Sequence, residues 1–381
     1  MSRLSRPWFS RVALAAALTV LAALSPPAGA ADKPPRPPRP ARPKVEVVFC
    51  LDTTGSMGGL IEGAKQKIWS ICNQIASGKP TPDLKVGLVA YRDKGDAYVT
   101  KVIDLTDDLD AIHGHLKTFK AEGGGDVPES VNQALDDAVH KVKWGADPKT
   151  LKIVFLVGDA PPHMDYADDV KYPQTCKKAV AKGIIINAIQ CGNDAECTKF
   201  WKDICVKAEG SYAQIAQEGG VVAIATPYDE KLARINTEMA KGTLAYGRGA
   251  KKEADKKKAL AAARLPSGEA AARAGYTAKD GKAASYDLLD AVKAKKVKLE
   301  DLKEEELPAE LQKLAPKERK AYLDKLDKRR GELKKQALEL DKKRSEFIRK
   351  KLAEGKKGKD SFDNQVLETL RKQARKHNIE Y

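Results

Sequence analysis

The chain divides into a region where apolar runs alternate with helix-like stretches and a region dominated by polar helical residues. The apolar runs are 45–51, 85–91, 98–105, 152–158, 183–190 and 211–216, and the helix-like stretches are 58–76, 128–143, 168–182 and 195–208. Several runs are apolar at consecutive positions, as expected for parallel strands covered on both faces. The pattern predicts an α/β fold with a doubly wound, mostly parallel sheet over residues 45–227, with sites beyond the carboxyl ends of the strands.

A different pattern begins at residue 228, where Lys, Ala, Glu and Leu dominate. Residues 228–381 are predicted to form a basic, largely helical C-terminal extension. Within it, residues 250–285 show little apolar periodicity, which predicts partial disorder there.

Two helices of this extension stand out. Residues 317–353 predict one long helix, in which large apolar residues recur every seven positions at Leu326, Leu333, Leu340 and Phe347. The interleaved positions are mixed, so packing on another element is favoured over a coiled coil. Residues 361–381 predict a last amphipathic helix.

The N-terminal residues have the features of an export signal. Residues 1–30 combine a basic stretch, an apolar run of 13 residues and a small-x-small pattern that places cleavage after Ala30. The run is too short to span a bilayer, so we expect a secreted or periplasmic protein with no transmembrane span in the mature chain. Residues 31–44 hold six prolines and predict an extended linker.

Charge is distributed unevenly between the two regions. Residues 45–227 hold 20 basic and 25 acidic residues, whereas 228–381 hold 41 basic and 27 acidic residues. The opposite net charges raise the hypothesis that the extension contacts the acidic region. The basic region also raises the hypothesis of contact with an anionic polymer, but it lacks interleaved aromatic residues, so no nucleic acid partner is expected.

All six cysteines fall in the acidic region. Export would permit disulfide bonds, and the short loop between Cys191 and Cys197 makes them the first predicted pair. Cys50 lies inside an apolar run and is predicted to be a buried small hydrophobic residue. The absence of a C-x-x-C motif argues against a zinc site built on cysteines.

Oxygen-bearing residues follow two of the buried strand runs. Asp52 ends the first run, and Thr54 and Ser56 follow at two-residue spacing, so one loop can turn three donors toward one point. Asp159 ends the fourth run, which is a neighbour of the first strand in a doubly wound sheet. Helix capping by the hydroxyls is the alternative explanation. Two facing carboxylates, however, need a proton or a cation, and oxygen donors favour Mg²⁺, Mn²⁺ or Ca²⁺.

A glycine-rich stretch between these motifs, "EGGGDVPES", supplies another acid, Asp126. With Glu129 three residues later, Asp126 fits a capping box at the start of a helix. The two roles of Asp126, capping and cation binding, are compatible.

The "DTTGS" loop, the Gly-rich loop and the strand-terminal "GD" together resemble the von Willebrand factor A domain family over about residues 45–227. In that family a D-x-[ST]-x-S loop, a second-loop Thr and a third-loop Asp form a metal-ion-dependent adhesion site (MIDAS). The resemblance implies that the ion is held, directly or through water, by Asp52, Thr54, Ser56 and Asp159. Val127 occupies the usual second-loop Thr position, and we assign the adjacent Asp126 to the site. The phrases "GGGDVPE" and "GDAPPHMDY" further resemble exported bacterial members.

The resemblance implies a non-enzymatic binding or adhesion module, in which the cation captures an acidic group of a protein or cell-envelope ligand. One alternative is a Mg²⁺-dependent phosphohydrolase with Asp52 as nucleophile, although Thr54 stands where such D-x-D enzymes carry their second Asp. A second alternative is a basic-tail binder of anionic polymers on a structural scaffold. No Ser/His/Asp arrangement or Walker loop supports an enzyme.

Overall fold

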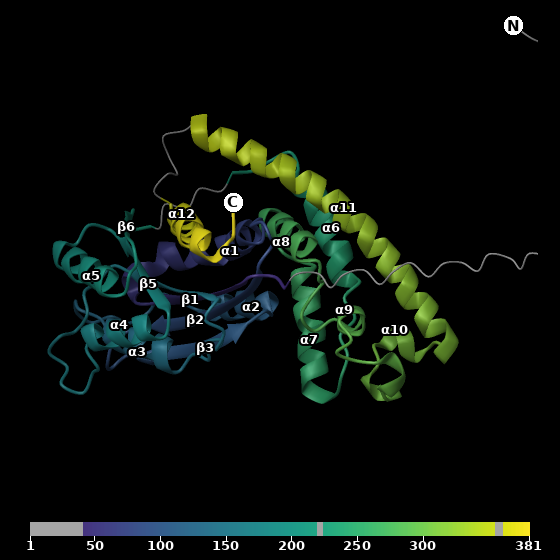
Figure 1. Ribbon diagram of the computed structural model, residues 1–381, viewed down its shortest axis with the longest axis horizontal. Helices are drawn as coiled ribbons and strands as arrows, with labels where there is room; N and C mark the ends of the chain where they lie inside the picture. Colours follow the sequence, from purple (N-terminus) through teal and green to yellow (C-terminus); the bar gives the residue numbers. More distant parts are fainter. Residues whose placement is uncertain (1–40, 219–223, 355–360) are drawn as a thin grey trace, which may run out of the picture. The chain divides into compact units, whose positions relative to one another are not determined.

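The computed structural model describes residues 41–218, 224–354 and 361–381. Six strands form one sheet in the order β3-β2-β1-β4-β5-β6 (Figure 1). Only the β2–β3 pair is antiparallel, which confirms the predicted doubly wound, mostly parallel sheet. The strands are β1 (Lys44–Asp52), β2 (Asp83–Tyr91), β3 (Thr100–Thr106), β4 (Leu151–Gly158), β5 (Ile184–Cys191) and β6 (Tyr212–Ile215).

Helices cover both faces of this sheet, as Figure 1 shows for α1 and α12 on one side and α3 and α4 on the other. The first face packs against α1 (Gly58–Ile75), α2 (Leu109–Thr118) and α12 (Phe362–Ala374). The second face packs against α3 (Val131–His140), α4 (Tyr172–Ala181) and α5 (Ala195–Lys207). Alternate residues of β1 point to opposite faces: Val47 and Phe49 face the first, and Val48 and Cys50 the second.

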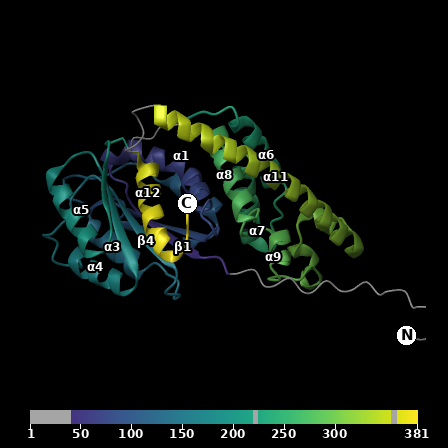
Figure 2. The same ribbon diagram turned by 45° about the horizontal axis from the view of Figure 1, so that its top comes forward.

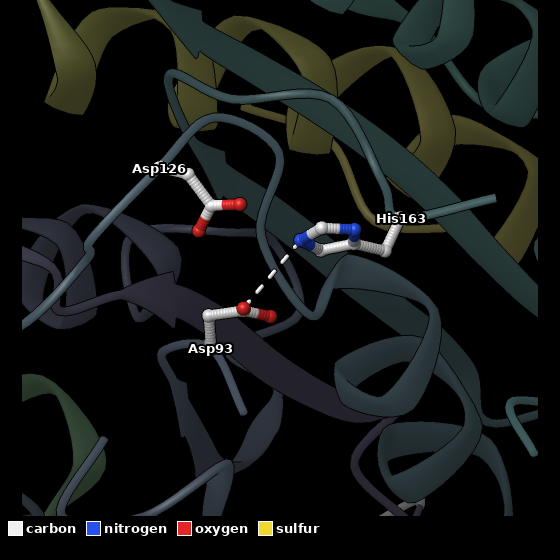
Figure 3. A group of neighbouring side chains, drawn as sticks. All are labelled: Asp93, Asp126 and His163. Atoms are coloured by element: carbon white, nitrogen blue, oxygen red, sulfur yellow. Dashed lines mark ion pairs between the residues drawn. The ribbon is translucent and has the colours of Figure 1, made fainter. Parts of the chain in front are cut away.

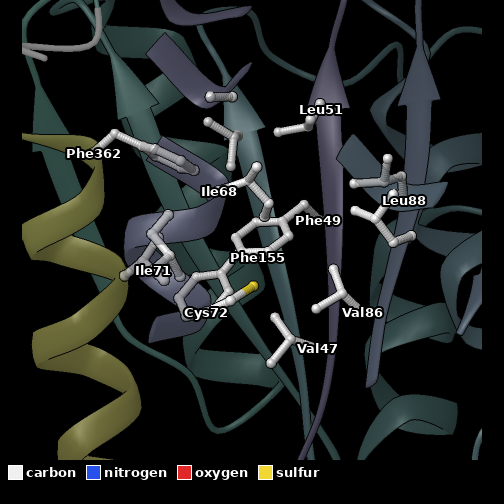
Figure 4. Packing of buried hydrophobic residues seen from close by; sticks show 14 of the residues in the cluster. Val47, Phe49, Leu51, Ile68, Ile71, Cys72, Val86, Leu88, Phe155 and Phe362 are labelled. Atoms are coloured by element: carbon white, nitrogen blue, oxygen red, sulfur yellow. The ribbon is translucent and has the colours of Figure 1, made fainter. Parts of the chain in front are cut away.

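The C-terminal helix α12 is part of the core of the sheet domain (Figure 2). Phe362 lies 6.1 Å from Phe49, whose ring stacks on Phe155 at 5.6 Å, measured between ring centroids (Figure 4). Tyr381 donates a hydrogen bond to the carbonyl of Ile75, 306 residues earlier in the chain. A segment at the far end of the sequence therefore completes the first face of the sheet.

The rest of the C-terminal extension is helical. It contains α6 (Asp229–Lys241), α7 (Gly249–Ala262), α8 (Ser267–Asp280), α9 (Leu288–Lys293), α10 (Ala309–Gln312), α11 (Pro316–Glu354), and the 3₁₀ turns Leu299–Asp301, Glu304–Glu306 and Arg375–His377. The partial disorder expected over 250–285 is wrong, because α7 and α8 occupy most of that stretch. The buried face of α8 consists of small residues, which give no clear periodic pattern of large apolar residues in the sequence. Ala271, Ala274 and Ala278 are nearly inaccessible to solvent and pack against α6 and α11.

Specific polar contacts join α8 to the sheet domain. Arg273, only 2% exposed, donates to both carboxylate oxygens of Asp110 in α2 at 2.8 Å. At Gly275 a side chain would clash with Asp341 of α11 and Asn73 of α1, so glycine allows three helices to meet there. The contact hypothesized from net charge is thus present as a buried Arg–Asp pair.

The predicted Cys191–Cys197 disulfide is absent, because all six cysteines are free and buried. Cys191 ends β5 and packs in the cluster on the first face of the sheet. Cys197 lies in the first turn of α5 and packs on the second face. Short sequence separation was misleading because the sheet lies between the two side chains.

Two predictions of the sequence lie partly or wholly outside the described residues. The export signal, residues 1–30, is entirely outside, and only 41–44 of the proline-rich linker are within. Among the residues that the structure describes, no helix combines the length and apolarity needed to cross a membrane. The long helix α11 contacts α6 and α8, which fits the predicted packing on other elements.

The role of α12 leads to a stability prediction. Replacing Phe362 by Ala should lower the free energy of unfolding by about 3–5 kcal/mol, because the change leaves a cavity beside the buried ring of Phe49. Urea unfolding followed by circular dichroism measures this. Leu260→Ala, at a position 55% exposed, is the control and should change the free energy of unfolding by less than about 0.5 kcal/mol. Equal effects of the two substitutions would contradict a core role for α12.

Candidate functional site

The first loop of the candidate site follows β1. Asp52 is fully buried, and its Oδ1 accepts hydrogen bonds from the backbone N–H (2.8 Å) and the hydroxyl (2.6 Å) of Thr54. The Thr54 Oγ1 lies 3.4 Å from the Ser56 Oγ. The loop therefore turns the three oxygen-bearing side chains toward one another, as predicted. Thr54 stands at the N-cap position of the 3₁₀ turn Gly55–Met57 before α1, but its hydroxyl donates to Asp52 and makes no capping hydrogen bond, so capping does not explain the hydroxyls.

The glycine-rich second loop is tied to the first by backbone hydrogen bonds. Gly55 N–H donates to the Gly123 carbonyl at 3.0 Å, and Glu122 N–H donates to the Thr53 carbonyl at 3.1 Å. Gly123 and Gly124 adopt φ values of 79° and 78°. A side chain at Gly123 would collide with Asp96, and one at Gly124 would crowd Glu129 and Thr54. These glycines are required for both their backbone conformation and the close approach of the two loops.

Glu129 is a site residue that the capping-box interpretation concealed. Helix α3 begins at Val131 with Ser130 as its N-cap, so Asp126 and Glu129 do not form a capping box there. Glu129 is 4% exposed, and its side chain lies beside Thr54. Its Oε2 is buried and has no hydrogen-bond partner within the described part of the chain. Glu129 therefore brings another carboxylate to the strand ends.

The third loop brings Asp159. The β1–β4 register pairs Leu51 with Val157, so Asp159 follows β4 next to the end of β1. Its Oδ2 accepts a 2.6 Å hydrogen bond from Gln217, which follows β6. Backbone hydrogen bonds join the second and third loops, from Glu129 N–H to the Pro161 carbonyl and from His163 N–H to the Glu129 carbonyl.

The three loops enclose an open cavity of about 520 Å³. Hydroxyls, carboxylates and glycine backbone dominate its lining, which includes Thr54, Ser56, Gly123, Gly124, Gly125, Asp126, Glu129, Asp159 and Gln217. Asp52 lies beneath this lining. The cavity therefore exposes oxygen donors to solvent above a buried acid.

Burial and mutual repulsion raise the pKa values of two of these acids. Burial raises the pKa of Asp52 to about 7, against hydrogen bonds from Thr54 that lower it, while Asp159 raises it further and Arg92 lowers it. Burial raises the pKa of Glu129 to about 9, and nearby carboxylates add to the shift: Asp52, Asp93, Asp96 and Asp159. The carboxylates near the cavity thus lack enough positive charge to balance them.

The donor set suits a hard divalent cation. Asp52 Oδ2 and Glu129 Oε2 are both buried and lack hydrogen-bond partners among the described residues. Such orphaned acceptors are costly unless a proton, water or cation satisfies them. Thr54, Ser56 and Asp159 add oxygen donors facing the cavity. The residues present therefore fit Mg²⁺, Mn²⁺ or Ca²⁺.

Asp126 lies at the rim of the cavity that Thr54, Ser56 and Asp159 also line. It is exposed, and Val127 beside it is 70% exposed. The Asp126 carboxylate lies near the side chains of Asp93 and His163, which come from two other loops (Figure 3). Asp126 thus lies at the cavity rim and also within 4.8 Å, measured between possible ligand atoms, of Asp93 and His163.

Comparison with known proteins identifies the family of the sheet domain. Residues 46–227 match the family model of the von Willebrand factor A domain. The chain contains a von Willebrand factor A domain. Among curated proteins, the putative ariadne-like RING finger protein R811 of Acanthamoeba polyphaga mimivirus is 27% identical over 119 residues, which make up 31% of this chain. The match spans 11% of that relative's length.

Three solved structures are also similar to part of the chain. BatB from Bacteroides thetaiotaomicron is 16% identical, covering 45% of this chain and 90% of its own, with a TM-score of 0.36. The SpRpn10 VWA domain is 14% identical, covering 46% and 88%, with a TM-score of 0.35. Proximal thread matrix protein 1 from the mussel byssus is 15% identical, covering 46% and 43%, with a TM-score of 0.34.

The sequence analysis did not identify three residues near the candidate site as site residues: Glu129, Arg92 and Gln217. Glu129 carried a signal, since an acid after a glycine-rich loop can be a ligand as well as a cap. Arg92 could also have been recognised from the sequence, because it directly follows the strand run 85–91 and therefore lies at the carboxyl end of a strand. Gln217 carried none, because nothing in its local sequence distinguishes it from an ordinary loop residue.

The raised pKa of Glu129 gives a pH prediction for the A domain without divalent cations. Between pH 4.5, the ordinary pKa of a Glu side chain, and about pH 9, Glu129 is protonated in the folded state but ionised in the unfolded state. This group therefore makes the stability of the domain fall as pH rises. Glu129→Gln removes the titration, so the variant should gain stability relative to wild type between pH 5 and pH 9. Urea unfolding in the presence of a chelator measures the difference.

The control for this prediction is Glu368→Gln, at an exposed position of α12. Its free energy of unfolding should follow that of wild type at every pH. If the free energy of unfolding varied with pH in the same way for wild type and Glu129→Gln, the pKa of Glu129 would not be raised in the folded state.

Proposed function

We propose that this protein is a binding module that captures an acidic group of a partner through a divalent cation held at the mouth of the A domain sheet. The observation that carries the proposal is the pair of orphaned buried oxygens, Asp52 Oδ2 and Glu129 Oε2, beside a cavity lined by hydroxyls. An A domain is a binding or adhesion module, and this donor set supports a MIDAS-type, cation-dependent form of that role.

The side chains have distinct tasks in this proposal. Thr54, Ser56 and Asp159 offer oxygens to the cation from the cavity lining. Asp52 fixes the Thr54 hydroxyl through its hydrogen bond and contributes negative charge from below. Gln217 holds one oxygen of Asp159, which orients the other. The bound cation supplies a coordination position that a partner's carboxylate can complete.

The cavity is consistent with an acidic protein or cell-envelope ligand. Its oxygen-rich lining would repel a carboxylate in the absence of a cation, so binding should be strictly cation-dependent. We also propose that the protein acts outside the cytoplasm, on the basis of the export pattern in residues 1–30. The large number of basic residues in the extension is balanced in part by internal pairs such as Arg273–Asp110, which favours a structural role for that region over polymer binding.

We propose a non-enzymatic role because of the position of Asp52. A phosphohydrolase needs this carboxylate to reach a phosphorus atom, yet Asp52 is fully buried. One of its oxygens is occupied by two hydrogen bonds from Thr54, and the other lies close to Gly158. Such a carboxylate supports a binding site better than it supports nucleophilic attack.

Isothermal titration of Mg²⁺ and Mn²⁺ into the purified protein tests the cation site. Asp52→Ala and Asp159→Ala should each weaken binding at least about tenfold, by analogy with the loss of metal-site partners elsewhere. Asp147→Ala is the matched control, since Asp147 is half-buried in the loop before β4, at the end of the sheet away from the candidate site. Circular dichroism confirms that each variant is folded. Equal Mg²⁺ affinities in wild type and both site variants would contradict the proposal.

An array of short peptides carrying Asp or Glu tests the partner chemistry. Binding in Mn²⁺, lost with chelator and in Asp159→Ala, is the expected result, and amide counterparts of the same peptides should not bind. Cation-independent binding of the peptides would contradict capture through the ion. Hydrolysis of p-nitrophenyl phosphate that depends on Asp52 would favour the phosphohydrolase instead.

A further inference from the structure

A second group of ligand-type side chains lies at the same edge of the sheet. Asp93 follows β2, Asp126 lies in the loop between α2 and α3, and His163 follows β4. One potential ligand atom from each of them lies within 4.8 Å of the others, and Figure 3 shows the three side chains facing a common point. The three residues are far apart in sequence, so the loops after different strands create this group.

The state of His163 is the observation that points to a ligand. The residue is 4% exposed, and its Nδ1 lies 2.8 Å from Asp165 Oδ1. Its Nε2 is buried and has no hydrogen-bond partner in the described part of the chain, although Asp93 Oδ2 is 3.4 Å away. In a neutral imidazole whose Nδ1–H donates to a carboxylate, Nε2 keeps a free lone pair. That lone pair would then face a carboxylate, which is unfavourable without a cation between them.

The surroundings hold Asp93 and His163 in place. Asp93 Oδ1 accepts a 2.8 Å hydrogen bond from the Ser130 hydroxyl, and its Oδ2 accepts one of 2.6 Å from the Tyr166 hydroxyl. The Tyr166 ring stacks on the His163 imidazole with 3.9 Å between centroids. Metal-binding histidines characteristically donate their other ring N–H to a carboxylate, as His163 can to Asp165. Two of the three ligands are therefore preorganised.

We propose that Asp93, Asp126 and His163 bind a first-row transition-metal dication of the Zn²⁺ type. An imidazole nitrogen with two carboxylates suits Zn²⁺, Co²⁺ or Mn²⁺ better than Mg²⁺, which prefers oxygen ligands alone. Ligand bonds of about 2.0–2.2 Å require the three atoms to approach slightly closer than they do here. Asp126 can make that adjustment because it is exposed and follows three glycines.

This second site is separate from the MIDAS-type site and does not depend on it. The two sites share no ligand, but Glu129 contacts both, since its side chain lies beside Thr54 and its carbonyl accepts a hydrogen bond from the His163 N–H. Ser130, which directly follows Glu129, holds Asp93. A cation at the second site would therefore offset negative charge next to Glu129 and tie together the loops that carry it.

The proposal is tested by titrating Co²⁺ into the purified, chelator-treated protein and following visible absorption. Competition with Zn²⁺ then gives the Zn²⁺ affinity. Wild type should bind with a spectrum that indicates nitrogen and oxygen ligands. His163→Gln and Asp126→Asn should each lower the affinity by about 10–100-fold. Asp52→Ala should keep the Co²⁺ spectrum, because Asp52 belongs to the other site.

His140→Gln is the matched control, because His140 is exposed at the end of α3 and pairs with Asp136. It should leave both the Co²⁺ spectrum and the Zn²⁺ affinity unchanged. Asp126→Asn changes an exposed side chain, so it tests the site even if His163→Gln fails to fold. Absence of Zn²⁺ binding by wild type would overturn the proposal and favour a protonated His163 between Asp93 and Asp165. Unchanged affinity in Asp126→Asn and in folded His163→Gln would also overturn it.

Discussion

Excess negative charge at the carboxyl ends of β1 and β4 is the constraint around which the functional edge of this protein is organised. Asp52 and Glu129 are buried acids, and Asp159 adds a third carboxylate at the same edge. Arg92 is the cation whose charge lowers the pKa of Asp52, but it does not prevent a rise to about 7. Carboxylates in such an environment are stable only when protonated or when positive charge is brought in.

The architecture keeps these groups together against their repulsion. Parallel pairing of β1 with β4 places the ends of the two strands side by side. Backbone hydrogen bonds then link the first loop to the second and the second to the third, which prevents the loops from separating. The positive φ angles of Gly123 and Gly124 allow this close approach. The backbone therefore holds a destabilising charge arrangement, as is common where a protein binds an ion.

The sequence predicted the parts of the fold and the site that depend on local pattern. Continuous apolar runs revealed the buried strands, and strand-terminal Asp52 and Asp159 could be placed together because doubly wound topology makes their strands neighbours. Glu129 was interpreted only as part of a capping box with Asp126, because a ligand loop and a capping box use the same residue types. Only the start of α3 at Val131 separates the two explanations.

Other features depend on tertiary contacts that leave no local pattern. The apolar side of α12 was recognisable, but its partner on the sheet was not, because amphipathicity does not identify what covers it. The buried side of α8 is built from alanines, which weaken any periodic signal. The cysteines were paired by proximity in sequence, whereas the sheet places Cys191 and Cys197 on opposite faces.

The position of α12 also has a consequence for the order in which the protein is made. A growing chain produces β1 long before Phe362, so the aromatic core around Phe49 and Phe155 stays partly uncovered until α12 has been made. Contacts between such distant segments slow folding and leave apolar surface exposed in the meantime. The nascent A domain must therefore avoid aggregation until α12 has been made and has packed on the sheet.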